Sequence, residues 1–392
     1  MSKVILHIDL NAFFATAEGL RHPEWGEEPI IVGGDSIRGV VSTCSYSARK
    51  YGVKSAMPIF EAKRLCPKAH FLPCDMAYYQ MLSNSFLTYL KNYSSLVEQA
   101  SIDEAYVDLT KAISKENDPL AFLKEIQDNL LEEIGLKSSL GVGCTKFLAK
   151  MASDMKKPMG ITVLRKKDIP FLLYPLPVSS FYGIGKKGAS ELEKIVIKTI
   201  GELESSIEKD DPNLKKIFGK MLKTIKDDLK GEGDDLVNPL PFNAKSISHS
   251  ETFSSDIDDI EIIKEKIFEL EHRCYEEIKR EGKSFKRVQL TVKDYNFKVY
   301  SRTYTFYEAP LEEKQIKKVL YDLYDEHFSS LLLRLVGVSF EDLINPKRET
   351  VQMSLWNYST FEEMDKTKLL VNELNRKMDK PVFTLLGDKN KK

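Results

Sequence analysis

Short apolar runs and helical periodicities alternate through the first 165 residues. Strands are predicted at 3–10, 39–44, 101–110 and 138–144, and helices at 79–97, 119–134 and 145–157. The second of these helices carries Asp118 as N-cap, Pro119 in its first turn and Gly135 as its stop, and Pro158 ends the third. This order predicts an α+β sheet, in which the strands at 3–10 and 101–110 carry acids.

The second half of the chain has a different organisation. Residues 178–230 are predicted to be helical and are rich in lysine, and 231–243 has the glycine, proline and acidic content of an interdomain linker. Beyond the linker, strands are predicted at 245–254, 284–296, 298–308 and 331–342, and helices at 258–281 and 311–328. This βαββαβ order is the ferredoxin-like arrangement. A polar tail with one apolar island follows from about Asn345.

Composition narrows the class of protein only a little. With 392 residues, 42% hydrophobic and 30% charged, the chain suits several soluble domains. The net charge of −1 does not decide for or against nucleic acid, because a whole-chain value hides local basic surfaces. Five cysteines without a C-x-x-C pair argue against a disulfide framework or a zinc ribbon. No signal segment and no 18-residue apolar run is present, so we expect a cytoplasmic protein without a membrane partner.

Asp103 and Glu104 are adjacent in a predicted strand, where successive side chains point to opposite faces. We therefore expect a bend at Ser101–Asp103 that lets both acids join Asp9. Three carboxylates can hold two Mg²⁺ ions, with substrate phosphates and water completing the coordination. The alternative is a solvent-facing acid pair at a turn.

Four motifs carry a family resemblance. "HIDLNAFFATAE", "STCSYSARKYGVKSAMP", "SIDEAYVDLT" and "ASDMKKPMGI" resemble the motifs of Y-family translesion DNA polymerases, most closely of the DNA polymerase IV branch, in that family's order and spacing. The resemblance implies a right-hand polymerase with a ferredoxin-like palm, small fingers, a helix-hairpin-helix thumb and a little finger. The implied domains are palm 1–11 and 77–165, fingers 12–76, thumb 166–230, linker 231–244, little finger 245–344 and tail 345–392.

The same resemblance implies residue roles and a reaction. Asp9, Asp103 and Glu104 match the catalytic, metal-binding acids, with the Leu10 carbonyl as a further ligand; the metal would be two Mg²⁺ ions, for which Mn²⁺ can substitute. Phe14 matches the steric gate that excludes a ribose 2′-hydroxyl. The implied nucleotide site comprises Phe13, Phe14, Thr43, Tyr46, Arg49 and Lys157, although plain core packing is the alternative for Phe13. Asn11 departs from the D-x-D pattern of many relatives, but the missing acid is not among these ligands.

Two segments predict contacts with DNA. "GIGKKG" has the glycine spacing of a helix-hairpin-helix turn, with Gly183, Gly185, Lys186 and Lys187 toward phosphate; a glycine-rich helix connector is the alternative. One face of the second predicted sheet is rich in hydroxyl and cationic donors and, by this pattern, free of acids. Its members are Ser246, Ser248, Ser250, Arg287, Gln289, Thr291, Lys293, Ser301 and Thr303. The alternative is a merely solvated sheet face.

The tail segment "QMSLW" resembles the bacterial peptide that binds a sliding clamp. Gln352 would bond at the pocket mouth, and Met353, Leu355 and Trp356 would fill apolar pockets, unless the segment folds onto its own domain. The expected partners are primer–template DNA, deoxynucleoside triphosphates and the clamp, with the chain as a monomer. The expected activity is template-directed, error-prone addition of deoxynucleotides to a primer. A nucleotide cyclase and a non-catalytic DNA-binding subunit are the alternatives.

Overall fold

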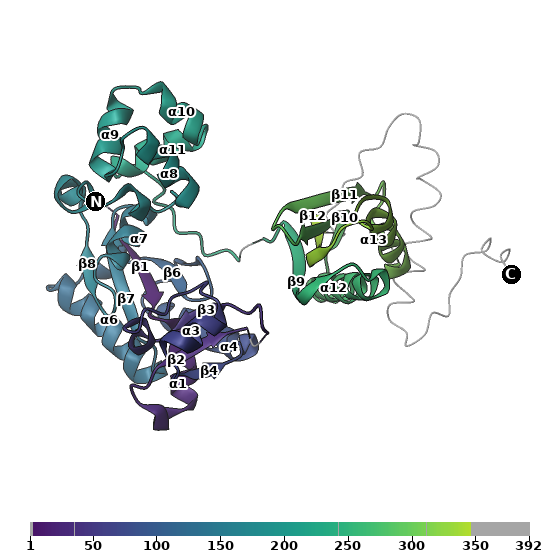
Figure 1. The fold of residues 1–392 in the computed structure, drawn as a ribbon. Coiled ribbons are helices and arrows are strands. Elements are labelled where there is room, and N and C mark those ends of the chain that lie inside the picture. Colours follow the sequence, from purple (N-terminus) through teal and green to yellow (C-terminus); the bar gives the residue numbers. More distant parts are fainter. Residues whose placement is uncertain (1–2, 35, 242, 311, 346–392) are drawn as a thin grey trace, which may run out of the picture. The chain divides into compact units, whose positions relative to one another are not determined.

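The computed structural model describes residues 3–34, 36–241, 243–310 and 312–345. The chain divides into two compact units, Met1–Asn243 and Ala244–Lys392, and the boundary lies within the predicted linker. Figure 1 labels the helices and strands of both units.

The first unit is built around a five-stranded sheet with the order β5-β6-β1-β7-β8. The strands are β1 (Ile5–Leu10), β5 (Val97–Gln99), β6 (Glu104–Asp108), β7 (Ser138–Gly143) and β8 (Ile161–Val163). β1 is central and antiparallel to both β6 and β7, which places Asp9 opposite Glu104 on one side and Ser139 on the other. The first four strands in chain order thus have the ferredoxin-like arrangement expected of the palm, and β8 extends the sheet.

Helices cover both faces of this sheet. The side chains of β1 alternate in direction, so each face receives some of them. Leu6, Ile8 and Leu10 enter the core formed with α4 (Met76–Leu90) and α6 (Pro119–Ile134). α7 (Lys146–Asp154) lies against β1 and β7 (Figure 1). Asp9 alternates with Ile8 and Leu10 along β1 and bonds to a side chain of α7, so it lies on the face away from the main core.

The helix predicted at 79–97 needs correction. α4 begins at Met76, where the Asp75 carboxylate accepts a hydrogen bond from the Tyr78 N–H, and ends at Leu90. The chain then turns and forms β5, a strand that the periodicity did not reveal. The apolar spacing continued to Tyr93 because that ring packs on Tyr89 after the helix has ended.

A small sheet with the order β3-β2-β4 forms the segment predicted as fingers. It contains β2 (Ile30–Gly33), β3 (Val41–Cys44) and β4 (His70–Leu72), with α1 (Phe13–Arg21), η1 (Pro23–Trp25), α2 (Tyr46–Arg49) and α3 (Ile59–Leu65) around it. Its core of small and apolar residues, including Ile31, Val41 and Cys44, is separate from that of the palm. α5 (Thr110–Ile113) follows β6 in the palm.

The segment predicted as thumb is helical, as its periodicity indicated. It comprises η2 (Lys166–Asp168), η3 (Ile169–Leu173), η4 (Val178–Ser180), α8 (Lys186–Lys194), α9 (Ile200–Glu208), α10 (Pro212–Phe218) and α11 (Met221–Leu229). These elements share one apolar cluster with Phe147, Leu148 and Met151 of α7, which fixes the thumb to the palm.

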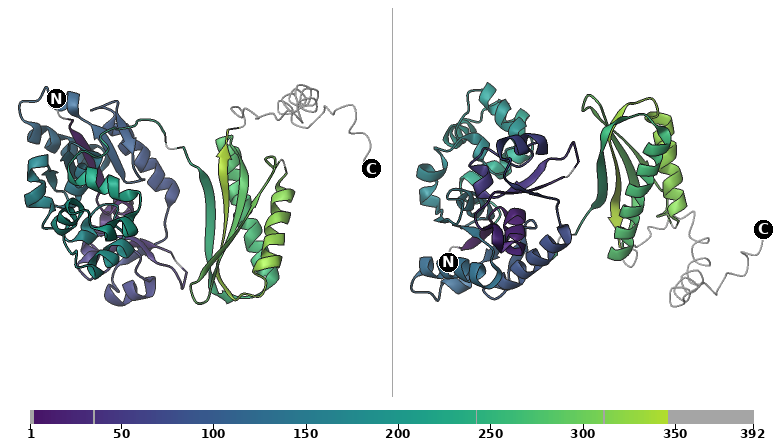
Figure 2. Two further views of the ribbon diagram at one scale, coloured as in Figure 1. Left: turned by 90° about the horizontal axis from the view of Figure 1, so that it is seen from above. Right: turned by 60° about the horizontal axis from the view of Figure 1, so that its bottom comes forward.

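The second unit is a four-stranded antiparallel sheet with two helices on one face (Figure 2). Its elements are β9 (Ser246–Ile257), α12 (Ile260–Glu281), β10 (Ser284–Asp294), β11 (Val299–Thr305), α13 (Glu313–His327) and β12 (Leu333–Ile344). Val288, Leu290 and Val292 are fully buried under the helices, and the residues between them are more exposed, as predicted.

The βαββαβ element order is confirmed, but the strand order differs from a ferredoxin-like sheet. The observed order is β11-β10-β12-β9, which makes β10 and β12 the central strands. A ferredoxin-like sheet has its first and third strands at the centre. Both orders bury the same alternating side chains, so period-two patterning cannot distinguish them.

Candidate active site

The predicted bend between β5 and β6 brings the acids together. The N–H groups of Ala100 and Ser101 both donate to the carbonyl oxygen of Glu104, and the Leu10 N–H donates to the carbonyl of Asp103 at 2.9 Å. Asp103 therefore lies in the bend, while Glu104 is the first residue of β6. The regular strand that would have separated the two acids is absent at this point.

One pocket of about 320 Å³ collects the predicted catalytic and nucleotide residues. Its lining combines residues of β1, α1, the bend, the fingers and the segment after α7. The lining residues are Asp9, Leu10, Ala12, Phe13, Phe14, Ser42, Thr43, Tyr46, Arg49, Ser55, Asp103, Glu104 and Lys157. All ten residues assigned from the sequence to metal or nucleotide are among them; the other three, Ala12, Ser42 and Ser55, had no such assignment.

Two lysines neutralise the acids at this pocket. Lys150 Nζ lies 2.7 Å from Glu104 Oε1 and 3.2 Å from Asp9 Oδ2. Lys157 Nζ lies 2.5 Å from the same Asp9 oxygen and 2.7 Å from Asp154 Oδ1. Lys150 is almost completely buried, and the sequence analysis did not identify it. Every residue of α7 from Phe147 to Ser153 is buried, so Lys150 does not stand out on one side of the helix.

Close packing of α7 on the sheet aims Lys150 at the acids. A Cβ atom on Gly141 of β7 would come within 2.1 Å of the Ala149 carbonyl oxygen and 2.2 Å of the Ser153 nitrogen. Only glycine therefore lets the helix lie this close to the strand. Thr145 caps the helix by accepting a hydrogen bond from the Leu148 N–H.

His7 supports the site from beneath. It is fully buried, its Nδ1 lies 2.9 Å from the Ser153 hydroxyl, and its ring packs on Tyr106. His7 is thus a packed strand histidine. Its Nε2 lies 3.6 Å from Glu104 Oε2, so the ring also contacts one of the acids. Burial lowers the pKa of His7, which favours the neutral ring.

The two paired acids differ in their electrostatics. Burial, together with the neighbouring Glu104 carboxylate, raises the pKa of Asp9 to about 6 against the opposing effect of Lys157 and Lys150. Burial would also raise the pKa of Glu104, but hydrogen bonds with His7, Asp9 and Lys150 outweigh it and hold that pKa below its ordinary value. The positive charge of a cation bound beside Asp9 would therefore be balanced by the Asp9 and Glu104 carboxylates.

The donor set fits a hard divalent cation. Carboxylate and carbonyl oxygens are the ligands that Mg²⁺ prefers. Among the described residues, however, no three His, Cys, Asp or Glu side chains form a ready-made metal cluster. The reason is visible in the contacts, because lysine ammonium groups hold Asp9 and Glu104, and Asp103 Oδ1 accepts the Ser101 hydroxyl at 2.5 Å. An ion would replace these contacts.

Phe14 is held rigidly in the pocket wall. Its ring stacks on Tyr79 with a centroid separation of 4.3 Å and an interplanar angle of 13°. The Tyr79 hydroxyl donates to the buried Glu18 carboxylate at 2.6 Å. Phe13 is buried in the core and also lines the pocket, so core packing accounts for much of its position.

The fingers contribute a cationic side of the pocket. Ser45 caps α2 by accepting from the Ala48 N–H, which places Tyr46 and Arg49 on the first and last residues of that short helix. The Arg49 guanidinium lies 4.4 Å from the centre of the Tyr46 ring, and its Nε donates to the Cys44 carbonyl. A fixed guanidinium, a hydroxyl and an ammonium group together suit a polyphosphate.

The residues predicted to contact DNA lie in two further places. In the thumb, Gly183 has a φ of +97°, a conformation that favours glycine, and Gly185 precedes α8 with Lys186 and Lys187 exposed. In the second unit, strand register aligns the predicted face in rows such as Ser248, Ser339, Gln289 and Thr303.

One expectation about that sheet face was wrong. It is not free of acids, because Glu341 of β12 lies between Ser246 and Arg287 in the register. Arg287 pairs with Glu341 at 3.7 Å and with Asp342. The error arose because the pattern of β12 was not included. Lys293 forms no ion pair with any acid in the described part of the chain, so cationic character remains toward that end of the strand.

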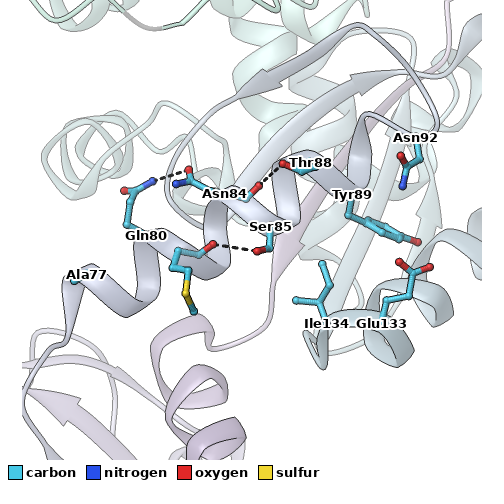
Figure 3. A pocket seen from close by; sticks show the side chains of 10 residues that line it. Ala77, Gln80, Asn84, Ser85, Thr88, Tyr89, Asn92, Glu133 and Ile134 are labelled. Carbon is cyan, nitrogen blue, oxygen red and sulfur yellow. Dashed lines mark hydrogen bonds between the residues drawn. The ribbon is translucent and has the colours of Figure 1, made fainter.

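A larger hollow of about 770 Å³ lies on the palm between α4 and the end of α6 (Figure 3). Gln80, Asn84 and Thr88 follow one another along α4 and bond to their own helix. Among the described residues of this lining, Glu133 is the only carboxylate, and no His, Lys or Arg accompanies it. The clamp motif at 352–356 lies outside the described residues. In the part of the chain that the structure describes, no helix is long and apolar enough to span a bilayer.

Comparison with known proteins gives a consistent picture. The model described as the impB/mucB/samB family matches residues 8–154, and that of the impB/mucB/samB family C-terminal domain matches 244–355. DNA polymerase IV of Oceanobacillus iheyensis is 34% identical over 99% of this chain and 92% of that protein. DNA polymerase IV 1 of Bacillus subtilis is 35% identical over 96% of this chain and 91% of that protein.

Solved structures agree with these relatives. The Y-family DNA polymerase chimera Dbh-Dpo4-Dbh has a TM-score of 0.79 and 25% identity, and covers 87% of this chain and 99% of its own. The insertion ternary complex of Dbh DNA polymerase has a TM-score of 0.59 at the same identity and coverage.

Proposed function

We propose that the pocket around Asp9 is the active site of a chain that belongs to the Y family of DNA polymerases, in its DNA polymerase IV branch. The chain is a DNA-directed DNA polymerase of the translesion class. The observation that carries the proposal is the convergence, in one pocket, of three carboxylates with an aromatic gate and a cationic wall. A cyclase or a non-catalytic binding subunit would require neither the gate nor this combination.

We propose that Asp9, Asp103, Glu104 and the Leu10 carbonyl hold two divalent cations, with Mg²⁺ as the ion and Mn²⁺ able to replace it. Bound there, the ions would lower the pKa of the primer 3′-hydroxyl and neutralise the triphosphate and leaving pyrophosphate. The oxygen donors support this assignment. Lys150 would keep Glu104 aligned, and Lys157 would exchange its Asp9 contact for the triphosphate.

The other pocket residues would bind and select the nucleotide. Arg49 offers a planar fork, while Tyr46 and Thr43 offer hydroxyl groups to phosphate oxygens. Phe14, fixed by its stack on Tyr79, would occupy the space of a ribose 2′-hydroxyl. Asn11 is engaged in structure, since its amide bonds to Ser139 and to the Met159 N–H.

The substitution Phe14→Ala tests this assignment. Removing the ring is expected to lower the preference for deoxynucleoside over ribonucleoside triphosphates by about a hundredfold, because the selection is steric. The measurement is single-nucleotide incorporation with matched pairs of triphosphates. Phe60→Ala, which removes an exposed phenylalanine of the fingers, serves as the control and should leave the preference unchanged. An unaltered preference in Phe14→Ala would remove the steric gate from the account.

The DNA contacts are proposed on chemical grounds. Backbone N–H groups near Gly183 and Gly185, with Lys186 and Lys187, would hold the duplex backbone in the thumb. The hydroxyl groups and Lys293 on the open sheet face of the second unit would hold sugar and phosphate without reading sequence. The partners are primer–template DNA and deoxynucleoside triphosphates. The domain boundaries predicted from the sequence are proposed to separate these roles.

We further propose that the tail motif binds a sliding clamp, through Gln352, Met353, Leu355 and Trp356, and that the chain acts as a cytoplasmic monomer. Tethering to a clamp raises the effective concentration of the enzyme at the primer end. The expected result is that added clamp lengthens the products of the parent chain and not those of Trp356→Ala. Equal stimulation of both would refute the motif.

A further inference from the structure

The turn between β10 and β11 exposes two aromatic side chains that have no role in the function proposed above. Tyr295 is 53% exposed and Phe297 is 62% exposed, and a single residue separates them in the sequence. Large aromatic rings left open to water on a small domain are a common sign of a binding surface.

Hydrogen bonds to Asp294 fix the backbone of this turn. The carboxylate of Asp294, itself nearly buried, accepts hydrogen bonds from the N–H groups of Asn296 and Lys298, both at 2.9 Å. The Tyr300 hydroxyl donates to its other oxygen at 3.3 Å, and the Phe297 N–H donates to the Asp294 carbonyl at 3.0 Å. Phe297 is held at a φ of +66°, a conformation that a phenylalanine rarely adopts. The ring is therefore displayed by a fixed backbone.

A bulge in β12 supplies a cation to the same ring. Along β10 the register shifts between Lys293, which pairs with Leu335, and Asp294, which pairs with Leu333, so Arg334 is an extra residue of β12 opposite β10. Its guanidinium lies 4.4 Å from the centre of the Phe297 ring. The guanidinium covers part of the ring, and the exposed fraction shows that much of the remainder is open.

The charges around the cluster are positive and available. Within the described residues, Arg334, Lys293 and Lys298 form no ion pair with an acid. The acid of the turn, Asp294, is buried and occupied by the N–H groups that it accepts from. A surface with open aromatic faces, a stacked guanidinium and unpaired cations matches the chemistry of unpaired bases and their phosphates.

We propose that Tyr295, Phe297 and Arg334 form a stacking platform for single-stranded DNA. Bases inside a duplex are covered on both faces by their neighbours, whereas an unpaired base can stack on an exposed ring. The platform therefore distinguishes single-stranded from double-stranded DNA and does not read sequence. The proposal rests on the polymerase function, since a primed template presents an unpaired strand.

The test compares binding of the full chain to a blunt duplex and to the same duplex with a single-stranded template overhang. Phe297→Ala is expected to bind the overhanging DNA about tenfold more weakly than the parent, while its affinity for the blunt duplex stays within about twofold. Phe297→Trp, which retains a stacking ring, should restore the affinity. Arg334→Lys, which keeps the charge and removes the planar group, should lose part of it.

Tyr307→Ala removes another exposed aromatic of the same unit and should change neither affinity. Equal losses on both DNAs for Phe297→Ala would overturn the proposal, because the residue would then serve the duplex or the fold. No loss on either DNA would also overturn it and would leave a protein partner as the use of the cluster. Primer extension by the parent on the overhanging DNA is measured in parallel. Its failure would count against the polymerase assignment and not against the platform.

Discussion

Lys150 is the residue on which the local electrostatics of the candidate active site depend. It is nearly buried and contacts both Asp9 and Glu104, so it compensates two carboxylates that lie opposite each other on neighbouring strands. A buried ion pair of this kind is costly to break from one side, because the remaining charges lose their partner. Its position supports an orienting role for Lys150, away from the substrate.

The substitution Lys150→Met tests that role. Loss of the ammonium group should loosen Glu104 and lower kcat by between about ten- and a hundredfold. It should also lower the Mg²⁺ concentration needed for half-maximal activity, because a cation would no longer compete with Lys150 for the two acids. Primer extension across a Mg²⁺ titration measures both quantities.

Lys156→Met is the matched control, since Lys156 is an exposed lysine close in sequence. Its kcat and Mg²⁺ dependence should equal those of the parent. An unchanged kcat in Lys150→Met would contradict the orienting role, and a higher Mg²⁺ requirement would contradict the competition.

At the scale of single residues, the sequence predicted the acids and the aromatic residue of the pocket better than the residue that holds the acids in place. Asp9, Asp103, Glu104 and Phe14 were assigned to one site because their motifs are specific and because the adjacent acids required a bend, and all four line one pocket. Lys150 was missed because a lysine in a lysine-rich helix looks like a solvated side chain. Its burial depends on the contact of α7 with Gly141, which no local pattern reveals.

Among the elements, those with strong local signals were predicted closely. α6 begins at Pro119 after the Asp118 cap and ends at Ile134 before Gly135, as its signals indicated. β5 and β8, with three residues each, are too short to show a period. The strand order of the second sheet depends on how its helices cross, which the alternating pattern does not encode.

Packing of the two helices of the second unit leaves a buried acid unpaired. Glu271 of α12 is fully buried, and neither of its carboxylate oxygens has a hydrogen-bond partner. Burial, with a smaller effect of Glu313, raises its pKa to about 8. The folded state therefore keeps this group protonated over a range in which the unfolded chain has released its proton.

The raised pKa of Glu271 determines how the stability of the second unit changes with pH. A raised folded-state pKa contributes stability that is complete below the ordinary value of 4.5 and is lost as the pH rises to about 8. Glu271→Gln should remove this dependence. Relative to the variant, the second unit of the parent should lose on the order of a few kcal/mol of unfolding free energy between pH 5 and pH 9.

The measurement is denaturant unfolding of the transition that belongs to the second unit, at several pH values. Glu265→Gln changes an exposed glutamate of the same helix and should behave like the parent. A constant difference between parent and Glu271→Gln across this range would show that Glu271 is ionised in the folded state.

At the scale of the whole molecule, the chain combines two units with separate cores. The first contains the pocket, and the second contains the open sheet face and the aromatic cluster at its β10–β11 turn. The resemblance of four motifs predicted the family, which the family models and relatives show, while the separate roles of the two units stay predictions. The placement of side chains within each unit needed the structure, because residues such as Asp9 and Lys150 are 141 positions apart in the sequence.

The most direct test of the account is primer extension with Mg²⁺ and deoxynucleoside triphosphates, comparing the parent with Asp103→Ala. The account predicts extension by the parent and a loss of about a thousandfold or more in the variant, because a carboxylate of the metal site is removed. Asp128→Ala, which removes an exposed acid of α6, should extend normally. Equal extension by the parent and Asp103→Ala would contradict the active-site assignment, and no extension by either would contradict the polymerase itself.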